Sequence, residues 1–443
     1  MTNKFYPVIG LEIHIELETR SKMFCPCSAK HFGKEPNSQT CPVCLGLPGS
    51  LPVPNKEAIK RTILLSLTLD CQINKITWFD RKNYFYPDLP KGYQISQFFK
   101  PLGKDGHITL QSNKVVKIRE IHLEEDTAKS IHKKINGKKV TLLDFNKSGV
   151  PLIEVVSEPD LTSAQEAKEY AQAIHQLVRH IKISHADMEK GQMRLEANIS
   201  LKKHPNDPLP PYKVEIKNIN SFKFLKDAIN YEINRQQKLL NQGKQISQET
   251  RGYDSKNKRT FIQRSKEEAY EYRYFPEPDI PPFMIDKLFD IEKLRKSIPE
   301  LPEQAVNRLT SQYHLSSYQA KIIAKSHKTL SYFEKAAKVG QKQKIKANNI
   351  ANIIINKKFS INKLSPQQLI NKIKAQKSQA LIGGKELKEI ITGVLQNNPQ
   401  AVGDYQKGKT NALTFLIGQV QKESRGKANI PETKKLLEER LNN

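Results

Sequence analysis

The sequence predicts an α+β protein in which a mixed region of strands and helices precedes an all-helical region. Alternating segments and amphipathic helical segments follow one another up to about residue 290. After two proline-rich breaks, the apolar spacing becomes helical throughout. At 443 residues the chain is too long for one hydrophobic core, so we expect two or three domains.

The first strand is predicted at GLEIHIELE, residues 10–18, where apolar and polar residues alternate strictly. One face carries Leu11, Ile13, Ile15 and Leu17, and the other carries Glu12, His14, Glu16 and Glu18. Further strands are predicted at VVKIREIHLEED, residues 115–126, and at YKVEIKNI, residues 212–219. The first strand therefore presents one face to a core and one acidic face to solvent or to a site.

Helix signals lie between and after these strands. The segment LTSAQEAKEYAQAIHQLVRHI opens with Ser163 and Glu166 at the spacing of a capping box and continues with helical periodicity. The segment SFKFLKDAINYEINRQQKLLNQG has Ser221 as its expected N-cap and Gly243 just past its end. Three helices are expected after residue 302 and three more near the C-terminus.

Two proline-rich segments, YFPEPDIPPFMI and IPELPEQ, mark a domain boundary near residue 292. The segment KAQKSQALIGG, residues 374–384, is predicted to be a second linker. We therefore expect a mixed domain at 1–292, a helical domain at 293–378 and a small helical tail domain at 379–443.

The chain is strongly basic, with 73 Lys and Arg, 46 Asp and Glu, and a net charge of +27. Residues 301–443 contain 25 basic and 9 acidic residues, so about a third of the chain carries more than half of the excess. This excess predicts a polyanionic partner, either nucleic acid or an anionic surface. A general lysine-rich bias of the sequence is the alternative. The C-terminal third is the expected contact with a phosphate backbone.

Four of the five cysteines lie within the 20 residues CPCSAKHFGKEPNSQTCPVC: Cys25, Cys27, Cys41 and Cys44. The N-terminus shows no secretory signal, and no apolar stretch is long enough to span a membrane, so a cytoplasmic protein is expected. Because cytosolic thiols stay reduced, C-x-C followed by C-x-x-C predicts four thiolates around one Zn²⁺. Four reduced thiols without metal are the alternative. Cys71, on an apolar face, is expected to be a buried core thiol.

A phosphate-loop pattern, GDYQKGKT at residues 403–410, lacks the strand before it that such a loop needs, and we reject it.

Two groups of acidic residues are stronger candidates for a catalytic site. Glu12 and His14 share a face of the first strand, and IHLEED adds His122, Glu124, Glu125 and Asp126. Carboxylates with an imidazole can hold Mg²⁺, which would provide an ATP site without a phosphate loop. A solvated polar face is the alternative.

A dense polar and aromatic segment, FDRKNYFYPDLPKGYQISQ, contains Lys82, Tyr84, Lys91, Tyr93 and Gln94. Such mixtures suit stacking on bases and holding phosphates, although a surface loop can have the same composition.

These motifs resemble one family closely: the B subunits of the aspartyl/glutamyl-tRNA(Asn/Gln) amidotransferases. The resemblance rests on VIGLEIHIEL, CPVCLGLPGSLPVPN, FDRKNYFYPDLPKGYQISQ, IHLEEDTAK, DFNKSGVPLIEVVSEPD, EIKNINSF, QETRGYD and EYRYFPEPDIPP, in the family's order. The ending NPQAVGDYQKGKTNALTFLIGQVQKESRGKAN is similar to the family's tail. Nearly the whole chain is covered.

The resemblance implies a cradle-like catalytic domain, a helical domain and a tail that binds the tRNA body. It implies that the chain phosphorylates the side-chain carboxylate of Glu-tRNA(Gln) or Asp-tRNA(Asn) with ATP and Mg²⁺. The partners implied are the A and C subunits of the amidotransferase, and ammonia that the A subunit releases from glutamine would then displace phosphate. A tRNA-binding scaffold without catalysis is the alternative, and the acidic set argues against it.

Carried onto this sequence, the resemblance implies that Glu12, His14, Glu124 and Glu125 are catalytic ligands of Mg²⁺. Three further acidic candidates are Glu154, Glu196 and Glu215; the family usually has Asp where Glu196 stands. Lys82, Tyr84, Lys91, Tyr93 and Gln94 would line the pocket for ATP and the acceptor end. The four cysteines match the family's zinc motif. In the tail, the residues expected to contact tRNA are Lys407, Lys409, Lys422, Arg425 and Lys427.

Overall fold

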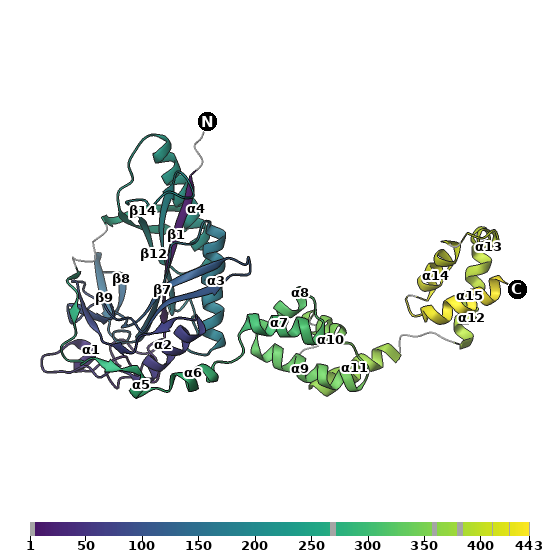
Figure 1. Ribbon diagram of the computed structural model, residues 1–443, viewed down its shortest axis with the longest axis horizontal. Helices are drawn as coiled ribbons and strands as arrows, with labels where there is room; N and C mark the ends of the chain where they lie inside the picture. Colours follow the sequence, from purple (N-terminus) through teal and green to yellow (C-terminus); the bar gives the residue numbers. More distant parts are fainter. Residues whose placement is uncertain are drawn as a thin grey trace. The chain divides into compact units, whose positions relative to one another are not determined.

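The structure is a computed structural model that describes residues 5–265, 272–356, 361–378, 384–409, 411–424 and 426–442. Its residues form two compact units, Met1–Leu301 and Pro302–Asn443. In the described residues all strands belong to the first unit, and the second unit is helical (Figure 1). The predicted α+β class is confirmed.

A nine-stranded sheet organises the first unit, in the order β14-β13-β12-β11-β1-β10-β7-β6-β2. Neighbouring strands are antiparallel except for β12 and β13, which are parallel. In sheet order the strands are Arg259–Ser265, Glu249–Asp254, Val214–Ile219, Met193–Lys202, Tyr6–Glu16, Pro151–Ser157, Val115–Glu125, Gly103–Thr109 and Gln72–Ile73.

The two faces of this sheet differ in character because successive strand residues point to opposite sides. Leu11, Ile13 and Ile15 of β1 are at most 1% exposed and lie in the main hydrophobic core. The alternation predicted for residues 10–18 is therefore confirmed within β1. The opposite face of β1 carries Glu12 and His14, so the core side and the polar side of the sheet are set by the same pattern.

Helices packed on the sheet complete this core. Helices α3 (Ala164–His180) and α4 (Phe222–Asn241) pack on each other and on the sheet, while α2 (Lys56–Thr68) packs on β6 and β7. The Ser163 hydroxyl accepts the Glu166 N–H at 3.1 Å, and Ser221 caps α4 in the same way. The Glu166 carboxylate accepts the N–H of Thr162 rather than that of the N-cap. Both predicted helices are confirmed.

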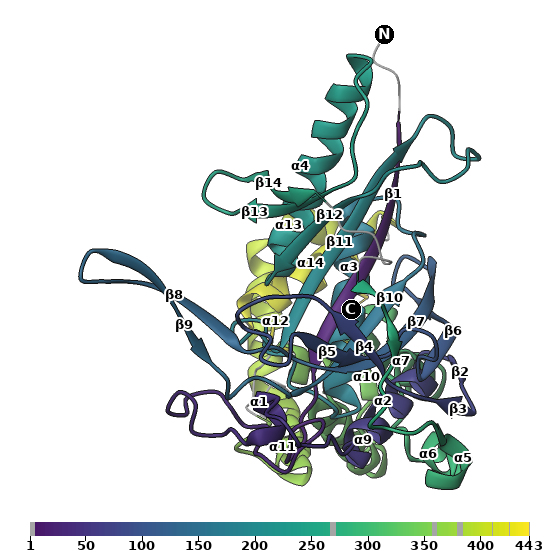
Figure 2. The same ribbon diagram turned by 90° about the vertical axis from the view of Figure 1, so that its left-hand side faces the viewer.

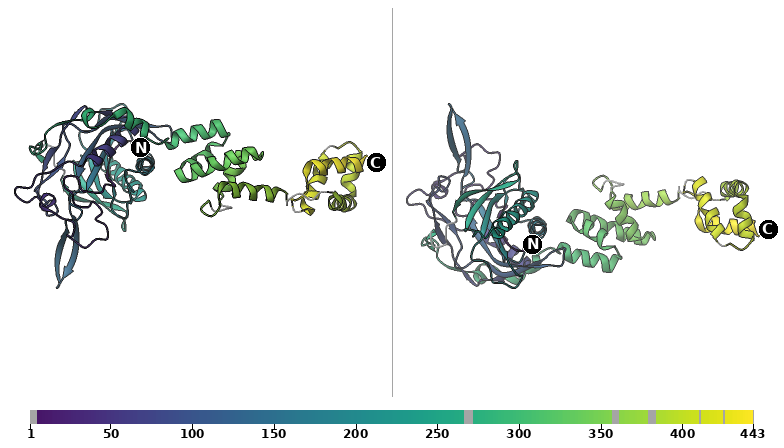
Figure 3. Two further views of the ribbon diagram at one scale, coloured as in Figure 1. Left: turned by 90° about the horizontal axis from the view of Figure 1, so that it is seen from below. Right: turned by 90° about the horizontal axis from the view of Figure 1, so that it is seen from above.

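Smaller elements surround the sheet. Strands β4 (Asp80–Asn83), β5 (Tyr93–Ser96) and β15 (Phe275–Pro276) form one small sheet, and β3 (Ile76–Thr77) pairs with β16 (Phe283–Met284). The proline-rich segment 274–285 thus includes two short edge strands, where a missing N–H is tolerated. Short helices are α1 (Pro42–Leu45), α5 (Ile285–Leu288) and α6 (Ile291–Ser297). Strands β8 (Lys129–Ile135) and β9 (Lys138–Asp144) form a separate hairpin that projects from the unit (Figures 2 and 3).

The second unit contains two hydrophobic clusters. The first is formed by α7 (Pro302–Tyr313), α8 (Ser317–Ala324), α9 (His327–Lys342), α10 (Ala347–Ile355) and α11 (Pro366–Ser378). The second is formed by α12 (Gly384–Asn397), α13 (Pro399–Gln406), α14 (Asn411–Glu423) and α15 (Ile430–Leu441). Helices precede and follow residues 407–409, so the structure agrees with rejecting a phosphate loop there.

The linker predicted at residues 374–384 is partly wrong. Residues 374–378 continue α11, and residues 379–383 lie outside the described residues. Lys, Ala and Gln favour helix, and Ile373 anchors this helix in the first cluster at 4% exposure. None of the described helices combines the length and the apolar character needed to cross a membrane.

Candidate functional site

A stripe of acidic side chains crosses the polar face of the large sheet. The register of β1 places Glu12 opposite Glu196 and His14 opposite Glu154. Glu215 on β12 lies one strand farther, opposite Asn198 of β11. Because directly paired residues share a face, five strands contribute to one polar surface. These side chains form two groups of three.

The first acidic cluster consists of His14, Glu124 and Glu154, whose ligand atoms all lie within 4.8 Å of one another. His14 Nε2 is 4.0 Å from a Glu124 oxygen and 3.9 Å from a Glu154 oxygen. Burial lowers the pKa of His14 to about 4, so its imidazole is neutral and keeps a lone pair. Burial, together with the charge of Glu124, raises the pKa of Glu154 to about 8.

These donors fit a divalent cation. Ligands of one Mg²⁺ stand at most about 4.2 Å apart, twice the usual bond length, so a small inward adjustment of the three groups would complete a site. A cation would offset the repulsion that now raises the pKa of Glu154. The Ser96 hydroxyl donates to the other Glu124 oxygen at 2.8 Å and fixes that carboxylate.

The second acidic cluster consists of Glu12, Glu196 and Glu215, again within 4.8 Å of one another. Glu196 and Glu215 are 7% and 5% exposed. The Asn198 amide donates to Glu12 at 2.7 Å, which leaves the second Glu12 oxygen for another partner. Three carboxylates at this spacing offer an all-oxygen donor set, which Mg²⁺ prefers.

Lys217 balances part of this negative charge. Its ammonium lies 3.3 Å from Glu196 and 3.6 Å from Glu215. Burial opposes its charge, but the two carboxylates outweigh burial and raise the pKa of Lys217. The sequence analysis missed this residue. Its position two residues after Glu215 in a strand was the available signal, since the two side chains must share a face.

Lys82 stands beside the first acidic cluster. Burial disfavours its charge, but Tyr274, Glu124 and Glu154 more than compensate, so the pKa of Lys82 lies well above its ordinary value. Its ammonium also lies over the rings of Tyr272 at 4.9 Å and Tyr84 at 5.9 Å. Lys82 therefore lies next to the carboxylates of the first acidic cluster, with Tyr84 packed against its ammonium.

Glu125 belongs to neither acidic cluster. Its carboxylate lies 2.5 Å from Lys91 Nζ and accepts the Ile95 N–H at 3.0 Å. The structure thus separates Glu125 from Glu12, His14 and Glu124, with which the sequence analysis had grouped it. Adjacent strand residues point to opposite faces, and Glu124 occupies the position that faces the acidic stripe. His122 lies directly opposite Glu154 in the sheet, and its ring contacts the Glu120 carboxylate at 3.1 Å and the Gln97 carbonyl.

A cavity of about 210 Å³ lies between β5 and residues 25–44, which we call the cysteine loop. It is lined by Lys91, Tyr93 and Glu125, with Cys25 and Cys44 on its wall. Gln94 is buried and donates to the Glu125 carbonyl at 2.7 Å, so it braces the strands rather than facing a ligand. Of the five polar and aromatic residues grouped in sequence, Lys82 and Tyr84 therefore lie at the first acidic cluster and Lys91 and Tyr93 in this cavity, while Gln94 lines neither.

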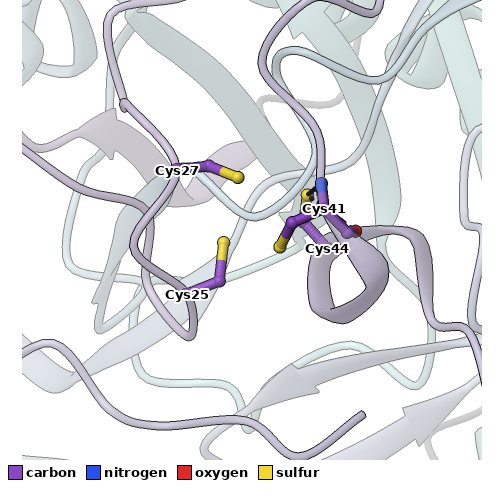
Figure 4. Close-up of side chains that lie close together, drawn as sticks. All are labelled: Cys25, Cys27, Cys41 and Cys44. Carbon is purple, nitrogen blue, oxygen red and sulfur yellow. Dashed lines mark hydrogen bonds between the residues drawn. The ribbon is translucent and has the colours of Figure 1, made fainter.

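The four cysteines meet in space. Their sulfur atoms all lie within 4.8 Å of one another, and Figure 4 shows Cys25 and Cys27 facing Cys41 and Cys44. Sulfur ligands of one tetrahedral Zn²⁺ stand about 3.8 Å apart, which follows from a bond of about 2.3 Å. All are free thiols, as is Cys71, which is 4% exposed in the main core as predicted.

A buried lysine adjoins this cysteine cluster. The ammonium of Lys22, which is 0% exposed, donates to Cys44 Sγ at 3.5 Å and to the Phe145 carbonyl at 3.2 Å. Hydrogen bonding with Cys25, aided by the charge of Lys22, lowers the pKa of Cys44 to about 4, which favours a thiolate, the form that binds zinc. The donor set and its charge therefore fit a Zn²⁺ site.

The tail residues expected to contact tRNA are exposed where they are described. Lys407 and Lys409 lie between α13 and α14, and Lys422 and Lys427 lie near the end of α14. Lys409 forms an ion pair with Asp404 at 3.0 Å. Arg425 lies outside the described residues.

Comparisons with known proteins agree with this arrangement. A family model described as the GatB/GatE catalytic domain matches residues 7–289, and a model described as the GatB domain matches residues 291–441. Together these matches span both units.

Full-length relatives are also found. A protein of Persephonella marina is 43% identical, covering 99% of this chain and 100% of the relative. One of Caldanaerobacter subterraneus is 41% identical and one of Thermosipho melanesiensis 40% identical, each covering 99% of both chains. All three relatives are named as the B subunit of an aspartyl/glutamyl-tRNA(Asn/Gln) amidotransferase.

Proposed function

Because the chain belongs to the family of aspartyl/glutamyl-tRNA(Asn/Gln) amidotransferase B subunits, we propose that it amidates misacylated tRNA in an ATP-dependent reaction. Its substrates are Glu-tRNA(Gln), Asp-tRNA(Asn) or both, and its products are Gln-tRNA(Gln) and Asn-tRNA(Asn). The observation that supports this most directly is the pair of acidic clusters on one sheet face.

The chemistry requires activation. A carboxylate does not accept ammonia directly, because an oxide would have to leave. The side-chain carboxylate of the tRNA-bound amino acid therefore attacks the γ-phosphorus of ATP, ADP leaves, and an acyl phosphate forms. Ammonia then attacks the acyl carbon, phosphate leaves, and an amide remains. Both anions of the first step must be brought together in one site.

The acidic clusters suit this first step. His14, Glu124 and Glu154 would hold one Mg²⁺, and Glu12, Glu196 and Glu215 a second. When bound, Mg²⁺ reduces the repulsion between the attacking carboxylate and the triphosphate and stabilises charge that develops during transfer.

The remaining residues position either a phosphate of ATP or the carboxylates of the two acidic clusters. Lys82, a partly buried cation beside the first acidic cluster, would pair with a phosphate oxygen. Tyr84 and Tyr272 pack around its ammonium and keep it in place. Lys217 holds Glu196 and Glu215 in one orientation. Asn198 restricts Glu12 to the rotamer that faces its neighbours.

Other parts of the assembly and of the chain supply three further functions. Ammonia comes from glutamine through the A subunit, in a complex that also contains the C subunit. The tail at 379–443, which follows the helical domain at 293–378, binds the tRNA body, with its exposed lysines on the phosphates. The cysteine cluster binds Zn²⁺ and stabilises the loop between Cys27 and Cys41.

The test uses the reconstituted complex with ATP and glutamine, on Glu-tRNA(Gln) and Asp-tRNA(Asn). Glu124→Gln and Glu12→Gln, one from each acidic cluster, are expected to slow amidation by a factor on the order of 10² or more, since each removes a group that stabilises developing charge. Binding of tRNA is expected to be unchanged. Glu158→Gln is the control, because Glu158 pairs with Arg119 on the surface of the same unit. Normal amidation by both cluster variants would refute the assignment.

A further inference from the structure

The hairpin β8–β9 carries a concentration of positive charge that the proposed mechanism does not use. Residues 127–143 contain no Asp or Glu. The hairpin has five lysines, all exposed: Lys129, Lys133, Lys134, Lys138 and Lys139. Such a concentration of cations indicates an anionic partner.

The hairpin is regular, and its only acidic residue, Asp144, lies at its base opposite Lys129. Seven residue pairs join its strands, and Asn136 and Gly137, with φ of 50° and 78°, form the two-residue turn. Lys134 lies directly opposite Lys139. Like charges in this position destabilise an antiparallel pair, and a bound anion would remove that cost.

Strand alternation gives the hairpin two different faces. One face carries Ser130, His132, Lys134, Lys139 and Thr141, which can all hydrogen-bond, with Leu143 at the base. The other face carries the apolar residues Ile131, Ile135, Val140 and Leu142 together with the remaining lysines, Lys129, Lys133 and Lys138. The polar face matches a phosphate backbone in chemistry, because ammonium and hydroxyl groups are the usual partners of phosphate oxygens.

The base of the hairpin connects the two sites already described. Strand β7, which carries Glu124, leads into β8, and β9 leads into β10, which carries Glu154. Asn37 of the cysteine loop donates its backbone N–H to Asp144 at 3.0 Å and its amide to the Leu143 carbonyl at 3.2 Å. The Phe145 N–H donates back to Asn37 at 2.7 Å. The cysteine loop therefore braces the hairpin beside the first acidic cluster.

We infer that the hairpin is an RNA-binding arm whose polar face contacts backbone phosphates of the double-stranded acceptor arm of tRNA. This inference rests on the proposed function, which places the aminoacylated 3′ end at the acidic clusters. A strand of seven residues extends roughly 20 Å from its base, so the tip reaches past the single-stranded end to the duplex. Contacts of this kind position the substrate without reading its sequence.

The experiment measures tRNA binding by the full-length chain over a range of salt concentrations. Lys134→Gln/Lys139→Gln is expected to weaken binding of tRNA(Gln), tRNA(Asn) and an unrelated tRNA alike. It should also reduce the slope of log K against log salt by about 2, one unit for each phosphate that no longer pairs with a lysine. Lys134→Arg/Lys139→Arg keeps the charge and is expected to bind normally. Lys203→Gln/Lys244→Gln, which neutralises lysines outside the hairpin, is the matched control.

An unchanged salt slope in the Lys134/Lys139 variant would overturn the inference. So would hydrogen exchange showing that the other proteins of the complex, without RNA, protect the hairpin amides, because the hairpin would then be a protein interface. Binding is measured without ATP and without amidation. A chain that binds tRNA through the hairpin but shows no amidation would therefore contradict the proposed function and leave this inference standing.

Discussion

Asp126 provides the most direct test of how the first unit holds its site together. The residue follows β7 immediately after Glu124 and Glu125, and its side chain is 3% exposed. Its carboxylate lies 2.5 Å from Lys147 Nζ and accepts from both Arg194 Nη atoms at 3.1 and 3.2 Å. It thereby links β7, the segment before β10, and β11. Asp126→Asn keeps the shape of this side chain and removes its charge.

The expected loss of stability follows from the cations left behind. Removing one partner of a buried ion pair lowers the free energy of unfolding by about 3–5 kcal/mol, because the other partner stays buried without its counter-charge. Lys147 and Arg194 keep 13% and 25% of their side-chain surface exposed, and Lys147 also lies 3.4 Å from Glu16. Water and Glu16 can therefore compensate in part. We expect a loss near the lower limit, about 3 kcal/mol.

Urea unfolding followed by tryptophan fluorescence measures this loss. The chain has one tryptophan, Trp78, and it lies in the first unit, so the signal does not report on the helical unit. With a denaturant slope of about 3 kcal/mol/M, a loss of about 3 kcal/mol lowers the midpoint by about 1 M. Asp105→Asn, at a 63% exposed side chain, is the control. A midpoint for Asp126→Asn equal to that of this control would refute the reasoning, and adding Lys147→Met should restore part of the loss.

Three further predictions concern the metal, the tail and a helix cap. Cys44→Ser is expected to reduce the zinc content, measured by elemental analysis, below one ion per chain. It should also speed amide exchange around Asn37, because the metal no longer ties the loop together. Full zinc content would argue against the four-thiolate site. Deleting residues 382–443 is expected to flatten the salt dependence of tRNA binding, because the tail lysines release counterions on binding; an unchanged slope would remove the tail from the tRNA interface. Ser163→Ala is expected to cost about 1 kcal/mol in urea unfolding, since the Glu166 N–H loses its acceptor; Ser163→Asn should retain most of the stability.

Local pattern was sufficient for several of the elements. The alternation around Glu12 and His14 predicted β1, and Ser163 and Ser221 marked the starts of α3 and α4. The spacing of the cysteines predicted a cluster that the structure then brought together. These predictions succeed because side-chain periodicity, capping and metal-ligand spacing act over a few residues. The linker at 374–384 failed in part because Ile373 draws that segment onto a core that local composition does not reveal.

The grouping of the site residues required the tertiary structure. Glu124 and Glu125 are neighbours in sequence, yet one joins His14 and the other pairs with Lys91. Glu196 lies far from Glu12 in sequence and directly opposite it in the sheet.

By itself, the sequence determined β1, the helices α3 and α4, the family, and which residue types could bind a metal. Only the folded sheet decided which carboxylates share a cluster, that Lys217 lies between two of them, and that the cysteine loop braces a basic hairpin. The physical reason is that strand register depends on packing of the whole sheet against its core, and a shift by one residue would send every one of these side chains to the other face.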